Sequence, residues 1–194
     1  MRPFVSYIWF SCLLFIYQPL HSQQLLFENY SSEQGLSQHF GLSIAQDGDG
    51  FMWFGTGEGL NRYDGRKFKI FTRLNEAGKK LPSNVILSLS FDSVNNLLWI
   101  GTPGGACLYV PSGDSIAALS SFFPFASSLD KLSVKKIVSF SPNEYWVITY
   151  NSGLIYLNTK SAALYSFFTS DEDKTNVTDV VWHDGKIIVS LLYN

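Results

Sequence analysis

Acidic residues gather between Asp47 and Glu58, at a spacing that could hold a calcium ion. Asp47, Asp49 and Glu58 occupy positions 1, 3 and 12 of a calcium-binding loop. Positions 5 and 6 are Phe51 and Met52, where such a loop needs an oxygen ligand and a glycine. The aromatic run that follows favours a strand. We therefore expect a hairpin turn here and no metal.

The other reactive residue types are isolated along the chain. Gly55-x-Gly57-x-Gly59 is glycine-rich, but no helix is predicted after it to receive a phosphate. His39 and His183 have no neighbouring Cys or second His that would complete a metal site. Cys107 lies in an apolar stretch that favours packing as a small hydrophobe. No Gly-x-Ser-x-Gly motif is present. We expect no catalytic residue, no metal and no cofactor.

The composition is that of a globular chain with many aromatic residues. It has 194 residues, a net charge of −2, 46% hydrophobic residues and 16% aromatic residues. Lys and Arg form no block that could neutralise a run of phosphates, so we expect no nucleic-acid partner.

A recurring Trp-x-Gly-Thr motif sets the positions of the acidic residues, glycines and Cys107 discussed above. It recurs about every 46 residues, a period typical of four-stranded propeller blades. Met52 to Gly59 and Leu98 to Gly105 carry the phrase, Tyr145 to Gly153 is a weaker copy, and Lys186 to Asn194 lacks the tryptophan. We expect a structural role for the repeated residues, with the indole rings packed between blades rather than stacked on sugars. These residues are Trp53, Gly55, Thr56, Trp99, Gly101, Thr102 and Trp146.

The predicted fold is all-β: a partial β-propeller of about three and a half four-stranded antiparallel blades. Within 24–194, the blades are expected at about 36–73, 81–119 and 132–168, with a partial blade at 176–194. Residues 25–30 are expected to form an outer strand that closes the ring, because pairing the first and last strands removes open edges. Phe122 to Phe125, in a long connector, could pack on the ring or form a contact patch, and packing is the favoured interpretation.

The first residues have the pattern of a secretory signal. Arg2 supplies a positive start, an apolar run from Phe4 to Tyr17 follows, and Pro19 ends it. The run is shorter than the roughly 18 to 20 apolar residues that span a bilayer. We expect a signal peptide over 1–23 that is cleaved rather than kept as an anchor.

Three phrases of the first blade carry a family resemblance: Gly35-Leu36-Ser37, the stretch from Asp47 to Thr56, and the stretch from Gly59 to Gly65. They closely resemble the two-component regulator propeller repeat. That resemblance implies the extracytoplasmic sensor region of a hybrid two-component histidine kinase of Bacteroidetes-type bacteria. It implies a periplasmic, non-catalytic part of an inner-membrane sensor whose kinase modules are absent here. Because such sensors carry complete rings, we expect this chain to be an N-terminal fragment.

In such a propeller, the connectors between blades share one face with the turns between second and third strands. We expect a ligand there, held by polar side chains that offer donors and acceptors. The candidates are Ser37, Gln38, His39, Glu58, Asn84, Asn151 and Ser152. The resemblance implies an oligosaccharide or another small polar ligand, and, as partners in the intact sensor, the remaining blades and a dimer partner. Alternatives are a free-standing secreted propeller adaptor and a secreted propeller lyase or glycosidase.

Overall fold

A computed structural model describes residues 27–74, 81–168 and 177–192. The predicted signal peptide at 1–23 lies outside the described residues. Within the described ranges the chain forms three four-stranded antiparallel sheets and one two-stranded sheet, which confirms the all-β partial propeller. The described helices are short 3-10 segments, and none is long and apolar enough to cross a bilayer.

Each sheet is built from strands that are consecutive in the sequence. The first consists of β1 (Gly41–Gln46), β2 (Met52–Thr56), β3 (Leu60–Tyr63) and β4 (Phe68–Phe71). The second consists of β5 (Ser88–Asp92), β6 (Leu97–Thr102), β7 (Gly105–Val110) and β8 (Ser115–Ala118). The third consists of β9 (Val134–Ser141), β10 (Glu144–Thr149), β11 (Leu154–Asn158) and β12 (Ala163–Phe167). The last pairs β13 (Val177–His183) with β14 (Lys186–Leu191).

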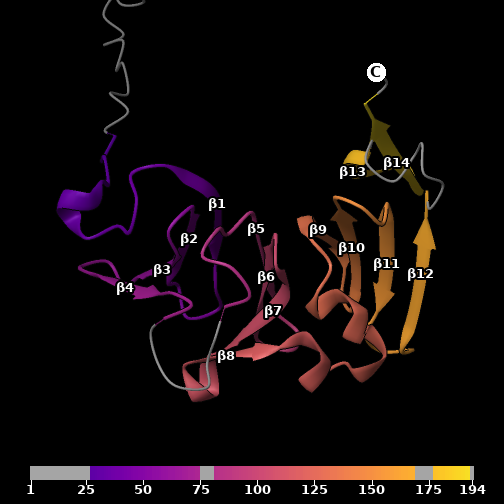
Figure 1. Cartoon of the computed structure of the whole chain (residues 1–194), viewed down its shortest axis with the longest axis horizontal. Coiled ribbons are helices and arrows are strands. Elements are labelled where there is room, and N and C mark those ends of the chain that lie inside the picture. The colour runs from indigo at the N-terminus through magenta and orange to yellow at the C-terminus, as the bar shows by residue number, and fades with distance from the viewer. Residues whose placement is uncertain (1–26, 75–80, 169–176, 193–194) are drawn as a thin grey trace, which may run out of the picture.

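The sheets follow one another around an arc, as blades do (Figure 1). Consecutive blades contact each other through their first strands, β1 against β5 and β5 against β9. The outer strands β4, β8 and β12 lie at the periphery of the arc (Figure 1). We call the sheets blades 1 to 4 in chain order.

The core lies between neighbouring blades and is centred on the repeated tryptophans. Trp53 is fully buried, with its ring centroid 4.4 Å from that of Tyr109 in blade 2. Trp99 is fully buried as well, 4.0 Å from Tyr145 of blade 3. Trp146 occupies the same register in blade 3 but is only half-buried, beside a hollow of about 300 Å³ that it shares with Trp182. Successive side chains of a strand point to opposite faces of the sheet, so one face of each second strand meets the next blade.

The repeated glycines allow neighbouring blades to approach closely. A Cβ added to Gly55 would lie 2.7 Å from the carbonyl oxygen of Ile86 in blade 2. One added to Gly101 would lie 2.8 Å from a methyl carbon of Val134 in blade 3. Blade 3 carries Ile148 at this position, where it packs with Val177 and Val180 of β13. The glycine of the repeat is therefore a packing residue between blades.

The connector after β8 packs on the ring, as expected. It contains the 3-10 segments η3 (Leu119–Ser121) and η4 (Pro124–Asp130). Phe123 stacks on Trp99 with ring centroids 5.6 Å apart, and Phe125 packs against the same cluster. Phe122 remains 43% exposed.

The outer strand expected at 25–30 stays a prediction, because residues 25 and 26 lie outside the described residues and the prediction concerns pairing with the last blade of a closed ring. Residues 27–30 belong to no strand, and the 3-10 segment η1 (Ser32–Gln34) follows them, begun by a capping box on Ser31. The ring of Tyr30 instead lies 5.0 Å from that of Tyr63 and 5.9 Å from that of Phe68. The segment thus packs by side chains on blade 1. A strand would need a neighbouring backbone edge, and none pairs with residues 27–30 in the described structure.

Candidate functional site

The threonine of the repeat builds the turn between the second and third strands of each complete blade. Thr56 Oγ1 donates to the carbonyl oxygen of Gly59 at 3.0 Å and accepts from the Glu58 amide at 3.1 Å. Thr102 and Thr149 make the corresponding pairs of bonds in blades 2 and 3. All three side chains are buried, so each turn projects its central residues to the surface from a fixed base.

Blade 1 brings three of the predicted ligand residues together. Ser37 Oγ is 2.8 Å from Thr56 Oγ1, and Gln38 Oε1 accepts from the Gly57 amide at 2.9 Å. The buried Asn61 donates through Nδ2 to Ser37 Oγ at 2.8 Å and accepts from the Ser37 amide at 2.9 Å. Ser37 and Gln38 therefore hold the turn, and the exposed Glu58 lies on it. Asn61 directly follows Gly59-Leu60, where the turn passes into β3. This position is the sequence signal that could have identified it.

The other predicted residues are distributed along the arc. His39 is exposed in the connector that leads into β1. Asn84 Oδ1 accepts from the Arg73 amide at 2.8 Å and so joins the end of blade 1 to the start of blade 2. Asn151 is exposed on the turn of blade 3, and the Ser152 amide donates to Thr149 Oγ1 at 2.9 Å. The structure does not gather these four side chains around blade 1's turn.

Blade 3 adds an exposed aromatic residue that the sequence analysis missed. Tyr150 follows Thr149 directly and is 43% exposed, while its amide donates to the Ser133 carbonyl at 2.9 Å. Lys135 Nζ lies 5.9 Å from the centre of the Tyr150 ring. The corresponding residues after Thr56 and Thr102 are Gly57 and Pro103. An aromatic residue at this repeat position is the signal that could have identified it.

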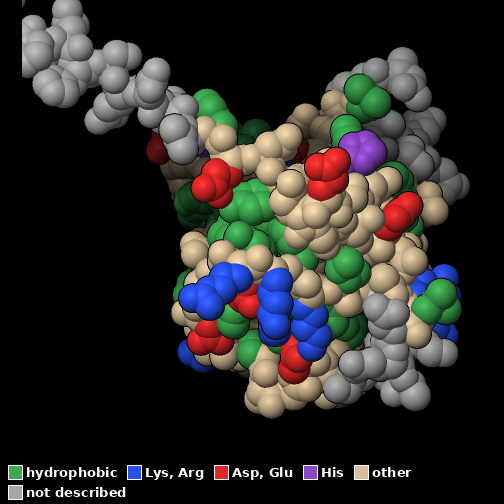
Figure 2. Space-filling model, turned by 90° about the vertical axis from the view of Figure 1, so that its left-hand side faces the viewer, with side chains coloured by type: hydrophobic (Ala, Val, Ile, Leu, Met, Phe, Trp, Pro, Cys, Tyr) green, Lys and Arg blue, Asp and Glu red, His purple; other side chains and the backbone are tan. Residues whose placement is uncertain are grey.

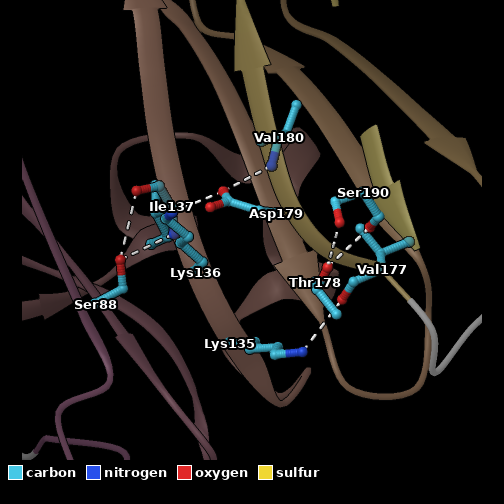
Figure 3. Close-up of polar contacts among 9 residues, drawn as sticks. All are labelled: Ser88, Lys135, Lys136, Ile137, Val177, Thr178, Asp179, Val180 and Ser190. Atoms are coloured by element: carbon cyan, nitrogen blue, oxygen red, sulfur yellow. Dashed lines mark hydrogen bonds and ion pairs between the residues drawn. The ribbon is translucent and has the colours of Figure 1, made fainter. Parts of the chain in front are cut away.

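Polar contacts hold blade 3 between its neighbours near this turn (Figure 3). Ser88 Oγ of blade 2 accepts from the Ile137 amide at 2.9 Å. On the other side, Lys135 Nζ donates to the Val177 carbonyl at 3.3 Å, and Lys136 Nζ contacts Asp179 Oδ1 at 2.7 Å. The hydrogen bond from Lys136 lowers the pKa of Asp179, so this carboxylate stays ionised at neutral pH. Lys135 is thereby positioned beside Tyr150.

The residues first considered for metal or thiol chemistry have structural partners. Asp47 Oδ1 accepts from the amides of Asp49 and Phe51, and Oδ2 accepts from the Trp53 indole N–H at 2.6 Å. The Asp47 carboxylate therefore shapes the β1–β2 turn and orients the core tryptophan. Cys107 is buried, and burial raises the pKa of its thiol, so a reactive thiolate is disfavoured.

The fold and its repeated Trp-x-Gly-Thr turns define a β-propeller blade array. Residues 35–58 match the family described as "Two component regulator propeller". The first blade thus matches the two-component regulator propeller repeat.

Comparison with known proteins extends this likeness beyond the matched repeat. The extracellular domain of a hybrid two component system from B. thetaiotaomicron is similar, with a TM-score of 0.69 and 26% identity over 84% of this chain and 23% of that chain. A second extracellular domain, from a one component system of the same organism, shares the fold, with a TM-score of 0.61 and 21% identity over 89% of this chain and 23% of that chain. "Histidine kinase P4" of Formosa agariphila is 36% identical over 66 residues, which is 32% of this chain and 5% of the kinase. The chain therefore spans only a small part of the proteins it matches.

Proposed function

We propose that this chain is the exported sensor part of a hybrid two-component system and that it captures a small polar ligand without catalysis. The observation that carries the proposal is the likeness, over 84% of the chain, to an extracellular domain of such a system. The repeat in residues 35–58 and the likeness to a histidine kinase agree with it. In the intact protein, the ligand would bias the kinase by binding one arrangement of the sensor better than another.

We place the ligand on the connector face, defined as the turns after Thr56, Thr102 and Thr149 together with the connectors between blades. The buried threonines give this face rigid turns. Tyr150 offers an exposed ring for the apolar face of a sugar, and Lys135 beside it offers a hydrogen-bond donor. Asn151 is exposed on the same turn as Tyr150, and Glu58 is exposed on the corresponding turn of blade 1. This chemistry suits an oligosaccharide, whose hydroxyl groups both donate and accept.

A binding measurement with Tyr150→Ala tests this placement. Isothermal titration calorimetry of the chain against a panel of neutral oligosaccharides should find a saturable ligand. Loss of the stacked ring should weaken binding of that ligand by about 3- to 10-fold, the range of an aromatic contact worth about 0.5–1.5 kcal/mol.

The matched control is Tyr165→Ala, which removes a tyrosine that is 59% exposed on the outer strand β12. This variant should bind like the unmodified chain. Equal weakening by both substitutions would contradict the connector face as the site. No saturable binding to any oligosaccharide in the panel would contradict the glycan part of the proposal.

Export is tested separately, by expression of the whole chain in a bacterium with an outer membrane. We expect the protein in the periplasmic fraction, shortened by about 23 residues at its N-terminus, since a signal peptide of this pattern is removed on export. Mass spectrometry of the purified protein checks the new N-terminus. A full-length chain in the cytoplasmic fraction would contradict export.

A further inference from the structure

A hollow of about 410 Å³ lies at the end of blade 1 opposite the connector face. It is formed where the β1–β2 and β3–β4 turns meet, far along the strands from the Thr56 turn. Its lining combines cations with aromatic rings: Phe51, Arg62, Asp64, Lys67, Phe68 and Lys69. Basic side chains gather on the side of the molecule that blade 1 occupies, with acidic ones beside them (Figure 2).

Arg62 is held in place by contacts on several sides. Its Nη1 donates to the Tyr109 hydroxyl at 2.6 Å and to Asp114 Oδ1 at 3.1 Å, both in the segment of blade 2. Its guanidinium carbon lies 4.8 Å from the centre of the Phe51 ring. A guanidinium oriented in this way keeps donors in a fixed plane, which suits recognition of a carboxylate or sulfate group.

Lys69 of β4 and Lys67, which directly precedes β4, bring further positive charge to the same hollow. Lys69 pairs with Arg62 across the β3–β4 ladder, and Lys67 lies two residues earlier, in the β3–β4 turn. Lys69 Nζ contacts Asp114 Oδ2. Among the described residues, Lys67 has no ion-pair partner.

The two carboxylates nearby do not neutralise this group of cations. Although partial burial opposes ionisation of Asp114, its hydrogen bonds from Lys69 and Tyr109 and the charge of Arg62 lower its pKa. Asp114 is therefore ionised, and two cations share it. Asp64 Oδ1 accepts from the amides of Lys67 and Arg66, both at 2.8 Å, and these bonds together with the charge of Lys67 lower the pKa of the Asp64 carboxyl. Within the described structure, three cations, Arg62, Lys67 and Lys69, thus face two carboxylates, Asp64 and Asp114, so one positive charge remains to meet an anion.

The cations of blade 1 are not a general feature of the blades. The residue opposite Trp53 on the third strand is Arg62, whereas the residue opposite Trp99 is Leu108. Arg62 is opposite Lys69 on the outer strand, whereas Leu108 is opposite Ala117. Blade 2 thus carries apolar residues at these two register positions, and blade 3 carries Tyr156 and Tyr165, where blade 1 presents cations.

We propose that this hollow is a second binding site, for a small organic anion that carries one carboxylate or sulfate group on a ring-sized body. Arg62 and Lys67 bind the acidic group, and the Phe51 ring contacts the body. A hollow of about 410 Å³ falls in the range of small-molecule sites and exceeds what an inorganic anion needs. The site does not depend on the sensor function proposed above.

Titration of the whole chain with four sugars at low ionic strength tests the proposal: glucuronate, galactose 6-sulfate, glucose and galactose. We expect saturable binding of at least one of the two acidic sugars and none of the neutral ones. Comparison of the two acidic sugars shows whether the site takes a carboxylate or a sulfate group. Binding should weaken as salt is added, because partly exposed charges are screened. Lys67→Gln should weaken binding by about 3- to 10-fold, since it removes one charge-assisted contact.

Lys160→Gln is the matched control, because Lys160 is an exposed lysine in the turn between β11 and β12 of blade 3. It should leave affinity unchanged, and neither variant should change the thermal midpoint, since Lys67 makes no side-chain contact between the described blades. Equal weakening by both variants would overturn the site. So would absence of saturable binding, or inorganic sulfate binding as tightly as galactose 6-sulfate, which would leave an adventitious anion contact only.

Discussion

Trp99→Ala should lower the free energy of unfolding by about 3–5 kcal/mol, the range for a large aromatic side chain removed from a core. Trp99 is fully buried, and its ring is stacked between Tyr145 of blade 3 and Phe123 of the connector after β8. An alanine would leave a cavity within the apolar cluster that Trp99 shares with blade 3 and the connector. Urea denaturation followed by circular dichroism measures the loss.

Further tryptophan substitutions separate the loss of packing from the loss of a hydrogen bond. The Trp99 indole N–H has no hydrogen-bond partner in the described part of the chain, so Trp99→Phe should cost much less than Trp99→Ala. Trp53→Phe should cost more than Trp99→Phe, because it also removes the bond to Asp47 Oδ2. Trp182→Ala is the exposed control, at 52% exposure, and should change stability little. A loss from Trp99→Ala no larger than that from Trp182→Ala would refute this account of the core.

Gly55→Ala is expected to destabilise the chain by about 1–3 kcal/mol, the usual cost of overpacking. We expect the loss of stability to lie near the upper end of this range. The added Cβ would lie 2.2 Å from Ser43 Oγ and 2.7 Å from both the carbonyl oxygen and a methyl carbon of Ile86. The serine can rotate, but the Ile86 carbonyl belongs to the backbone of blade 2. Relief therefore requires that blades 1 and 2 move apart. The thermal midpoint and the urea midpoint both report the effect.

Gly41→Ala provides the matched control at the start of β1. A Cβ there would meet no atom within 4 Å, and Gly41 is not among the glycines with positive φ. This substitution should be neutral or slightly stabilising, because alanine restricts the unfolded chain more than glycine does. Similar destabilisation by the two substitutions would mean that close approach of the blades is not the reason for glycine in the repeat.

The sensor proposal and the anion site place two kinds of recognition at opposite ends of the same blades. The connector face is built on turns fixed by buried threonines, while the hollow beside Arg62 lies at the opposite end of blade 1, by its β1–β2 and β3–β4 turns. Because the two regions share no residue, Tyr150→Ala and Lys67→Gln should act independently. Distant substitutions with no shared partners usually have additive effects.

The repeat alone determined the blades, because its signals are local. Alternation of apolar residues specifies strands, and Thr56, Thr102 and Thr149 close turns with residues three or four positions away. The spacing of the tryptophans then predicted their common position in each second strand. These properties depend on side chains that are close in sequence, so a single chain reveals them.

Only the tertiary structure decided which polar residues meet. Arg62 and Asp114 are far apart in the chain, and their contact requires blade 2 to lie against blade 1. The same holds for Lys135, which reaches the Val177 carbonyl of blade 4 and lies beside the exposed ring of Tyr150. The packing of Tyr30 on Tyr63 likewise joins residues that are distant in the sequence. Contacts of this kind depend on how whole sheets are placed, which no local pattern encodes.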